Sequence, residues 1–562
     1  MRAKLWIVLA LFALVLVAGR GLAAYHHEGE SDAANFLSVY PEAAGTKLDH
    51  CALCHTGGSY EKSEDNWVSL GSCQWCHYSY GYDGSGNIVE TLNSYGKDYF
   101  IAGRNAAAIS AIDVEDSDED GYANQTEIAA RRFPGNAADD PSKTAAPFRV
   151  YTRAQLEALG QHTQFMLMNT SRSGDFYAQY TGVPVEDLLD YAGSLDTATG
   201  ITVFAPDGWS TYHPLDQDED PELYHVRGTY PQASYYYEAA AEAWCDYSAP
   251  SCSGRANGDP ISVEGGLKML LAYKREGAYL DVGQLTDENK LDGEGPFRVV
   301  PPQKTPSAPD QSSRAADQDV VWPYVYEWDH NAGAASRSAT MIRVEPLPEG
   351  MTDIDVLEAG WNYVDQGKIV VYGAIDGSDS NGNGILDSEE GGDDLDGDGI
   401  VDAEDPDTAS FTHAAGGGKV GMRCSAGTFA GVSALTMDDP AMGAGERPAL
   451  SFPYGAVQFM VTGLTAGDTV TVSLTFPAAV PIDARYFKVA ANGDWNEVPF
   501  GSNAGDATIT LTLTDGDAAT DADGVADGTI IDPGVLGVPA AADGSGGGSS
   551  GCFLRALGHL TR

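Results

Sequence analysis

Basic residues are scarce in this chain. Its 562 residues include 32 Lys and Arg against 82 Asp and Glu, and the formal net charge is −50. Such a surface repels nucleic-acid phosphates, so we exclude nucleic acid as a partner. An acidic surface suits divalent cations, cationic redox partners or plain solubility outside the cell.

Long apolar runs are missing after the N-terminus. The first apolar run, Leu5 to Ala18, follows Arg2 and Lys4 and precedes small residues that end at Ala24. This pattern predicts a secretory signal peptide over residues 1–24. An uncleaved anchor is the alternative, although the run is short for a membrane span. We expect export to the periplasm, the outer-membrane surface or the extracellular medium.

Cysteine is rare as well, with eight in the whole chain, and half of them fall within 26 consecutive positions. They form two C-x-x-C-H units, Cys51 to His55 and Cys73 to His77. The unit is the attachment signature of a c-type haem, in which both thiols bond to one porphyrin and the adjacent His ligates the iron. The predicted covalent attachment residues are Cys51, Cys54, Cys73 and Cys76, and the predicted proximal ligands are His55 and His77.

Two other interpretations fit the same cysteines. Their spacing matches a four-thiolate zinc site, and two simple disulfides would suit an exported protein. We favour two haems because a His follows each pair although the chain has only 11 His. A second ligand on each iron must be a soft or nitrogen donor, and His27, His50 and His162 are the predicted distal ligands.

The remaining cysteines are Cys245, Cys252, Cys424 and Cys552. Cys245 and Cys252 are expected to close a short disulfide loop in an oxidising compartment. Nothing in the sequence decides whether Cys424 and Cys552 pair.

Three acidic stretches match the EF-hand calcium loop, with oxygen-bearing residues at fixed positions and Gly at position 6. The first loop contributes Asp116, Asp118, Asp120, Tyr122, Asn124 and Glu127. The second contributes Asp379, Asn381, Asn383, Asp387 and Glu390. The third contributes Asp394, Asp396, Asp398, Asp402 and Asp405, and its final Asp predicts weaker binding because Asp reaches less far than Glu. Solvated acidic turns or a disordered acidic linker are the alternatives.

The order of motifs over residues 25–345 resembles a known family. Tyr40-Pro41, both haem motifs, the phrase from Cys76 to Asp83, the first calcium loop and Gly293-Glu294-Gly295-Pro296 occur in this order. Together they resemble the GEGP-motif dihaem c-type cytochromes of bacteria over residues 25–345. The resemblance implies an exported electron-transfer protein and does not supply a substrate.

Residues 148–345 predict a mixed α/β domain, with a capping box at Thr152 and Gln155 and a helix over 185–191. Tyr180 to Leu189 and Gly295 to Pro301 are similar to pieces of the molybdopterin-binding fold of sulfite-oxidase-like enzymes. That family ligates molybdenum through a thiolate upstream of the Gly-Val-Pro element, and this chain has no Cys between Cys76 and Cys245. We therefore expect a fold relative without the metal, because Ser171 or Ser173 cannot replace a thiolate.

The C-terminal third predicts an all-β sandwich, because apolar residues alternate with Thr and Ser over 470–476 and 509–513. It resembles the choice-of-anchor domain of bacterial surface proteins. A Gly/Ser linker and Cys552 follow, and processing or surface attachment at this tail is one expectation. The predicted divisions are 25–147 (dihaem domain in which haem supplies most of the core), 148–345 (α/β domain), 346–412 (calcium spacer), 413–540 (sandwich) and 541–562 (tail).

The leading functional prediction is electron transfer by two haem c groups, with calcium bound at the loops and unidentified redox proteins as partners. No Ser-His-Asp set, phosphate loop or paired-carboxylate motif is present, and no catalytic residue is predicted. A redox enzyme whose middle domain acts on a small molecule is the second interpretation. A surface-anchored sensor or adhesion module is the third.

Overall fold

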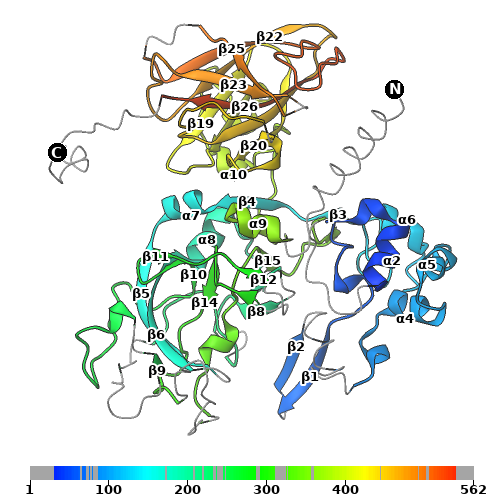
Figure 1. The fold of residues 1–562 in the computed structure, drawn as a ribbon, viewed down its shortest axis with the longest axis vertical. Helices are drawn as coiled ribbons and strands as arrows, with labels where there is room; N and C mark the ends of the chain where they lie inside the picture. Colours follow the sequence, from blue (N-terminus) through cyan, green and yellow to red (C-terminus); the bar gives the residue numbers. More distant parts are fainter. Residues whose placement is uncertain are drawn as a thin grey trace, which may run out of the picture.

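The structure is a computed structural model. It describes residues 31–63, 66–70, 75, 79, 86–170, 174–206, 209–217, 221–231, 236, 245–246, 249–285, 291–310, 325, 327–355, 360–395, 397–443, 445–490, 493–501 and 505–539. Outside these residues lie the predicted signal peptide 1–24, His27, Cys73, Cys76, His77, Ser171, Ser173, Asp396 and the tail 541–562. The chain is multidomain and mostly β, with a helical N-terminal region, a middle domain and a C-terminal domain (Figure 1).

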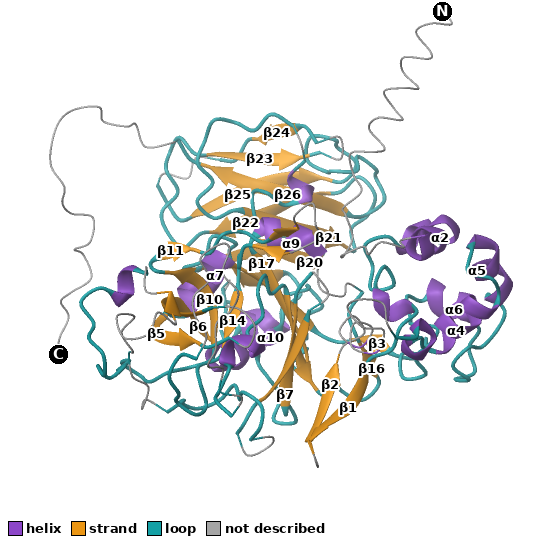
Figure 2. Ribbon diagram, turned by 60° about the horizontal axis from the view of Figure 1, so that its bottom comes forward, coloured by secondary structure: helices purple, strands orange, loops and turns teal. Residues whose placement is uncertain are grey.

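Short helices make up most of the regular structure in the described N-terminal region. They are α2 (Ser31–Val39), α4 (Ser94–Ile101), α5 (Ala106–Ile112) and α6 (Asn124–Ala129), with 3-10 turns η1 (Pro41–Ala43), η2 (Cys51–Leu53) and η3 (Ile88–Thr91) and the hairpin β1 (Gly58–Ser63) and β2 (Asn66–Leu70). Figure 2 shows the four helices gathered on one side of the molecule. Their core includes Phe36, Tyr95, Ile109 and Phe133. The region therefore has an apolar core of its own, whereas we expected haem to supply most of it.

Local signals set several helix ends in this region and the next. The sequence predicts that Asn105 caps a helix through Ile112, and Asn105 does cap α5 through Ala108 N. The sequence also predicts a helix that continues through Arg132, but α6 stops at Ala129, because Arg131 adopts a left-handed φ of 56°. In the middle domain the capping box at Thr152 and Gln155 is formed.

Two sheets build the middle domain. The first has the order β11-β10-β6-β5, with β14 and β9 paired at its sides. Its strands are β5 (His162–Met168), β6 (Asp175–Pro184), β9 (Cys245–Asp246), β10 (Leu270–Arg275), β11 (Ala278–Tyr279) and β14 (Arg298–Val300). The second has the order β4-β17-β15-β7-β8 and consists of β4 (Phe148–Thr152), β7 (Gly200–Phe204), β8 (Ser210–Pro214), β15 (Met341–Glu345) and β17 (Lys368–Gly373). One buried cluster of apolar side chains draws on both sheets.

The remaining elements complete the middle domain. They are α7 (Arg153–Leu159), α8 (Val185–Ala192), α9 (Gly360–Gln366), η5 (Pro250–Cys252), η6 (Asn331–Ala334) and the short pairs β3 (Thr144–Ala145) with β16 (Met351–Thr352) and β12 (Gln284–Leu285) with β13 (Leu291–Asp292). Strand β17 pairs with both β15 and β4, so it is an interior strand of the second sheet. The predicted boundary at 345 is therefore wrong, and the middle domain continues past Gly373.

Two antiparallel sheets form the C-terminal domain and share one core. One is β18 (Thr408–Thr412), β19 (Lys419–Cys424), β22 (Thr469–Thr475) and β25 (Thr508–Thr514). The other is β20 (Thr428–Leu435), β21 (Ala456–Thr462), β26 (Ile530–Gly537), β23 (Arg485–Val489) and β24 (Trp495–Val498). The all-β prediction for this region is confirmed, and its first strand starts at Thr408 rather than after 412. Short helices α10 (Asp387–Glu390), η7 (Asp402–Glu404) and η8 (Pro440–Met442) accompany the sheets. Among the described residues, no helix combines the length and apolar character that a membrane crossing requires.

Candidate functional site

The first haem motif begins in the 3-10 turn η2. Its N-cap is His50, whose Nδ1 accepts a hydrogen bond from Ala52 N at 3.0 Å. The amide of His55 donates to the Cys51 carbonyl at 2.9 Å, which continues the turn through both cysteines. The spacing of Cys51, Cys54 and His55 is thus held in one compact turn.

The start of α4 holds this turn from the opposite side. The Asn93 side-chain amide donates to the carbonyls of Ala52 at 3.1 Å and Leu53 at 3.0 Å, and its backbone amide donates to the Cys54 carbonyl at 2.9 Å. A Cβ at Gly96 would lie 2.1 Å from the Cys54 oxygen, so only glycine permits this approach. The sequence analysis did not identify Asn93 and Gly96 as supports of this turn, because neither residue belongs to a recognised motif.

The hydrogen bonds of His55 select one of its ring nitrogens. Its Nδ1 lies 2.8 Å from the Thr91 hydroxyl, which itself donates to the Ile88 carbonyl at 2.7 Å. Because the hydroxyl proton is used there, the ring donates through Nδ1 and its Nε2 keeps a lone pair. Burial lowers the pKa of His55, which favours the neutral ring that binds metals. This arrangement fits the proximal ligand of a haem iron.

Trp75, inside the second motif, is described. A Cβ built on Gly58 would lie 2.6 Å from ring carbons Cδ2 and Cε2 of Trp75. Gly58 is three positions after His55, so Trp75 lies beside the segment that follows the first motif.

The predicted distal ligands have different surroundings. His162 lies on β5 in the middle domain, and its Nε2 donates to the Gly266 carbonyl at 2.8 Å. A distal role through Nε2 would require that bond to break. His50 is the cap of η2, and its Nδ1 is already used there. His27 lies outside the described residues, so all three assignments stay predictions.

The loop at 116–127 gathers acidic side chains. Ligand atoms of Asp116, Asp118 and Asp120 lie within 4.8 Å of one another. Both carboxylate oxygens of Glu127 and of Asp118 are buried without a hydrogen-bond partner. Burial, reinforced by the neighbouring carboxylates, raises the pKa of Glu127 to about 8 and that of Asp118 to about 6. Buried carboxylates without donors fit a hard cation with oxygen ligands.

The other members of this loop shape it. Gly121, at position 6, has a φ of +101°, as the tight turn requires. Asn124 uses its side chain internally, because its oxygen accepts from Ser117 N at 3.2 Å and its amide donates to the Ile112 carbonyl at 2.8 Å. Tyr122 donates its amide to Asp120 at 2.8 Å, and its carbonyl occupies position 7 of the pattern.

The loop at 379–390 has the same spacing but a different interior. Glu390 is fully buried, and it accepts from the side-chain amides of Asn383 at 2.9 Å and Asn381 at 3.2 Å. Two backbone groups fix the orientation of the Asn383 side-chain amide. Its oxygen accepts from Ile385 N, and its nitrogen donates to the Thr408 carbonyl. Nitrogen donors therefore occupy the position where a calcium loop presents oxygens.

Acidic residues at the edge of that loop bind backbone. Asp379 accepts from the amides of Gly382, Asn383 and Gly384, and Asp387 accepts from Ser380. Burial raises the pKa of Glu390 to about 7 even though three donors, including Ser410 N, contact it.

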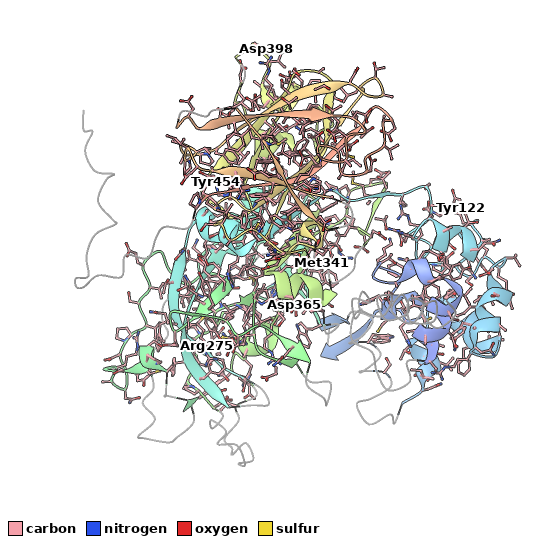
Figure 3. All side chains as sticks on the ribbon, turned by 45° about the horizontal axis from the view of Figure 1, so that its top comes forward. Tyr122, Arg275, Met341, Asp365, Asp398 and Tyr454 are labelled. Atoms are coloured by element: carbon pink, nitrogen blue, oxygen red, sulfur yellow. The ribbon has the colours of Figure 1, made fainter. Side chains whose placement is uncertain are left out.

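The third loop, at 394–405, is joined to the second. Asn381 donates to the carbonyls of Asp402 at 2.7 Å and Asp405 at 3.2 Å. One carboxylate oxygen of Asp402 and one of Asp405 are buried without a hydrogen-bond partner. Asp394 accepts hydrogen bonds from the backbone amides of Gly397 and Gly399, and Asp398 accepts one from the amide of Ile400. In Figure 3, Tyr122 of the first loop and Asp398 of the third lie at separate ends of the molecule.

No family model, no curated protein and no solved structure matches this chain. The site is therefore interpreted from its own residues.

Glu294 of the Gly-Glu-Gly-Pro motif belongs to a partly buried ion cluster in the middle domain. Glu294 contacts Arg275 and Arg298, each at 2.9 Å, and Arg298 donates to the Tyr180 hydroxyl at 3.1 Å. The two guanidinium groups outweigh burial and lower the pKa of Glu294. Glu294 is thus a paired carboxylate that holds β10 to β14.

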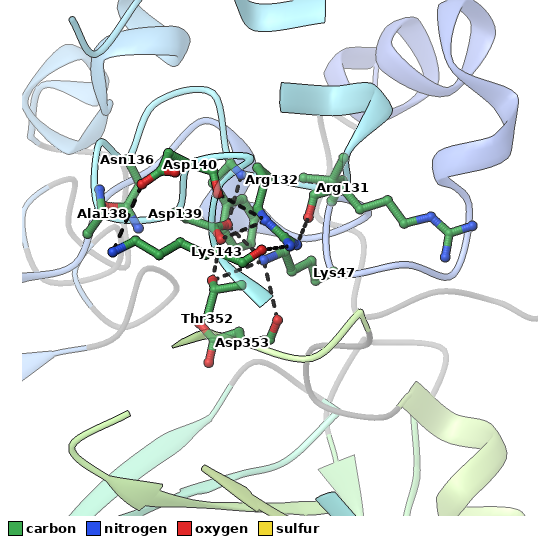
Figure 4. A network of polar contacts seen from close by, with 12 residues as sticks. Lys47, Arg131, Arg132, Asn136, Ala138, Asp139, Asp140, Lys143, Thr352 and Asp353 are labelled. Atoms are coloured by element: carbon green, nitrogen blue, oxygen red, sulfur yellow. Dashed lines mark hydrogen bonds and ion pairs between the residues drawn. The ribbon is translucent and has the colours of Figure 1, made fainter. Parts of the chain in front are cut away.

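A second polar network joins the N-terminal region to the middle domain (Figure 4). The Lys47 ammonium is fully buried and contacts Asp139 at 2.7 Å and the Thr352 hydroxyl at 3.5 Å. Asp139 also accepts from Phe133 N, and the Thr352 hydroxyl donates to it. Lys47 precedes Cys51 by four positions, so the network fixes the haem motif relative to the middle domain. Sequence reasoning missed it because its members are distant in the chain.

The structure describes only some of the remaining cysteines. Cys424 is buried in the sandwich core, where its thiol donates to the Gly427 carbonyl at 3.5 Å. Cys552, whose pairing with Cys424 the sequence leaves undecided, and the side chain of Cys245 lie outside the described part of the chain.

Proposed function

We propose that this protein is an exported dihaem c-type cytochrome that transfers electrons in the periplasm or at the cell surface. The observation that carries the proposal is the first motif, where one turn holds Cys51, Cys54 and His55 and Thr91 orients the imidazole. A zinc thiolate site or a disulfide would not need a His whose Nδ1 is fixed so that Nε2 is available. Haem c, when attached, supplies an iron that cycles between two oxidation states.

The chain's residues contribute orientation and proximity. Thr91 accepts from His55 Nδ1 at 2.8 Å, and a hydrogen bond at this nitrogen strengthens a ligating imidazole. Gly58 lies against Trp75, which supports two redox centres close to each other in one small region. The acidic surface favours cationic redox partners, whose approach it would accelerate.

Calcium belongs to the same proposal. The orphaned oxygens of Glu127 and Asp118 support a cation at 116–127. Helices α5 and α6, which flank this loop, supply Ile109, Ile112 and Ile128 to the core of the N-terminal region. A bound cation would therefore stabilise the region that carries both haem motifs.

The enzyme alternative receives less support. Glu294, the carboxylate of the middle-domain motif, is neutralised by two arginines, whereas a general acid or base needs a pKa near the working pH. The chain also lacks the upstream thiolate that a molybdenum site requires.

Haem content tests the proposal. We expect two haems per chain that remain attached after acid–acetone extraction. Cys51→Ala with Cys54→Ala should leave one haem, and so should Cys73→Ala with Cys76→Ala. The matched control, Cys424→Ala, should keep two. Zinc instead of iron in the purified protein would overturn the proposal.

Ligand binding and potential separate electron transfer from catalysis. We expect both reduced haems to be low-spin and to leave carbon monoxide unbound. Thr91→Val should raise the potential of one haem by weakening its imidazole ligand, whereas Thr91→Ser keeps the hydroxyl and the potential. Carbon monoxide binding by the unmodified protein would favour the enzyme instead.

A further inference from the structure

The C-terminal domain contains a lysine and an aspartate that are buried together on neighbouring strands. Lys488 on β23 pairs in register with Gly534 on β26, and Asp532 lies two positions before Gly534. Alternate residues of a strand point to the same face of a sheet, so Lys488 and Asp532 share one face. Their side chains are 1% and 0% exposed, and Nζ lies 3.8 Å from Oδ2.

The Asp532 carboxyl has no hydrogen-bond donor. Neither of its oxygens has a partner, and the hydroxyl of Tyr486, also buried nearby, has none either. The Lys488 amine donates instead to the Thr520 carbonyl at 2.6 Å. Asp521, the other buried carboxylate in this group, has its oxygens bound by the amides of Gly516 and Ile531. A buried ion pair without supporting hydrogen bonds is unfavourable.

Lys47 and Asp139 show what a satisfied buried pair looks like in the same chain. Their contact is 2.7 Å, and Asp139 also accepts from Phe133 N and the Thr352 hydroxyl. These donors stabilise the ionised carboxylate. Lys488 and Asp532 lack such donors at the carboxyl, so their charged forms gain far less.

Burial favours the neutral forms of both Lys488 and Asp532. It lowers the pKa of Lys488, and it raises the pKa of Asp532 to about 6 despite the nearby ammonium. A proton passed from the ammonium to the carboxylate gives a neutral amine beside a carboxylic acid. These are the two reactants of amide formation, held together where water is excluded.

We propose that Lys488 and Asp532 form an isopeptide bond that joins β23 to β26 within the mature domain. The Nζ lone pair attacks Cγ of the protonated Asp532, the C–N bond forms, and the C–OH bond breaks. Nitrogen loses one proton, the carboxyl loses its hydroxyl, and these leave together as water. No oxidant, reductant or further reactant is needed. The bond covalently links two neighbouring strands of the sandwich, and it is independent of the electron-transfer proposal.

Peptide mapping of the denatured full chain tests the bond. Trypsin cleaves after Arg485 and Lys488, and a Glu-specific protease cleaves after Glu497. Without the bond, Tyr486–Lys488 is released as a tripeptide. With it, cleavage after Lys488 is blocked, and the fragment 486–497 stays attached to the fragment that starts at Val498, with the mass of one water lost.

The expected result is the branched fragment in most chains, with the link mapped by fragmentation to Lys488, the single lysine of 486–497. Release of the tripeptide from most chains would overturn the proposal, as would a link to Asp521 or another carboxyl. Lys488→Arg and Asp532→Ala should each abolish the branch. The matched control, Lys47→Arg, changes another buried lysine and should keep the branch. If a variant does not fold, the peptide map of the unmodified protein alone decides whether the bond is present.

Discussion

The loops at 116–127 and 379–390 have the same spacing of side chains, yet their interiors differ. In the first, Glu127 and Asp118 are buried with no hydrogen-bond donor. In the second, the amides of Asn381 and Asn383 donate to Glu390. The Asp residues at positions 3 and 5 of the first loop are Asn in the second, and amides donate as well as accept. Equal spacing of the side chains therefore predicts an equal shape of the two loops. It does not predict whether the buried carboxylates of a loop require a cation.

The largest expected difference concerns calcium. At a calcium concentration a hundred times the dissociation constant, binding should stabilise the first loop by about 2.7 kcal/mol. Hydrogen exchange in peptides covering 106–129 should therefore slow by about a hundredfold on adding calcium. Glu127→Gln should remove most of this protection, because it removes an anionic ligand.

The matched control is Glu390→Gln, the same substitution at the same loop position of the second loop. It should leave the calcium effect at 106–129 unchanged. Equal exchange rates with calcium and with chelator in the unmodified protein would show that the first loop is only an acidic turn.

Removing the Glu390 carboxylate from the second loop should destabilise the C-terminal domain even when no calcium is present. Glu390→Ala removes the acceptor that three donors share, on Asn381, Asn383 and Ser410. The expected loss is about 1–3 kcal/mol in the free energy of unfolding of the C-terminal domain, measured by urea denaturation. Glu404→Ala, at an exposed position nearby, should change it by less than about 0.5 kcal/mol. A loss that calcium restores would contradict the interpretation.

One substitution should make the second loop behave like the first. Asn383→Asp replaces a buried amide with a carboxylate beside Glu390 and removes a donor to the Thr408 carbonyl. Without calcium it should destabilise the domain by about 2 kcal/mol, because a donor is lost and charges repel. Calcium should recover part of this loss. If calcium does not change the stability of the variant, the side-chain amides are not the cause of the difference between the two loops.

The smallest expected effect is on pH dependence. The pKa of Glu127 is raised from 4.5 to about 8, so the folded, calcium-free loop prefers the protonated acid. Its contribution to stability is fully present below pH 4.5 and is lost as the pH rises through about 8. Calcium binding should therefore release a proton at pH 7 and little at pH 9, measured with an indicator dye. Glu127→Gln should lose this proton release, and an equal release at both pH values would contradict it.

Local features were predictable because their hydrogen bonds join residues close in the chain. The Asn105 cap, the box at Thr152 and Gln155 and the alternating strands β22 and β25 follow from such patterns. Asn492-Gly493-Asp494 predicts a hairpin between two strands, and β23 and β24 on either side of it pair antiparallel. The sequence analysis did not predict strand β17, because its short apolar run lies within an acidic stretch of the chain. Only its pairing with β4 and β15 identifies it as a strand.

By itself, the sequence determined the motifs, their spacing and the local turns that place Cys51, Cys54 and His55 together. It also determined the spacing of the acidic side chains in the three loops. Tertiary structure alone decided which buried groups have partners: Thr91 at His55, no donor at Glu127, two amides at Glu390 and the unsatisfied pair of Lys488 and Asp532. The physical reason is that the protonation and reactivity of a buried group depend on the donors and charges around it, and folding brings these from distant parts of the chain.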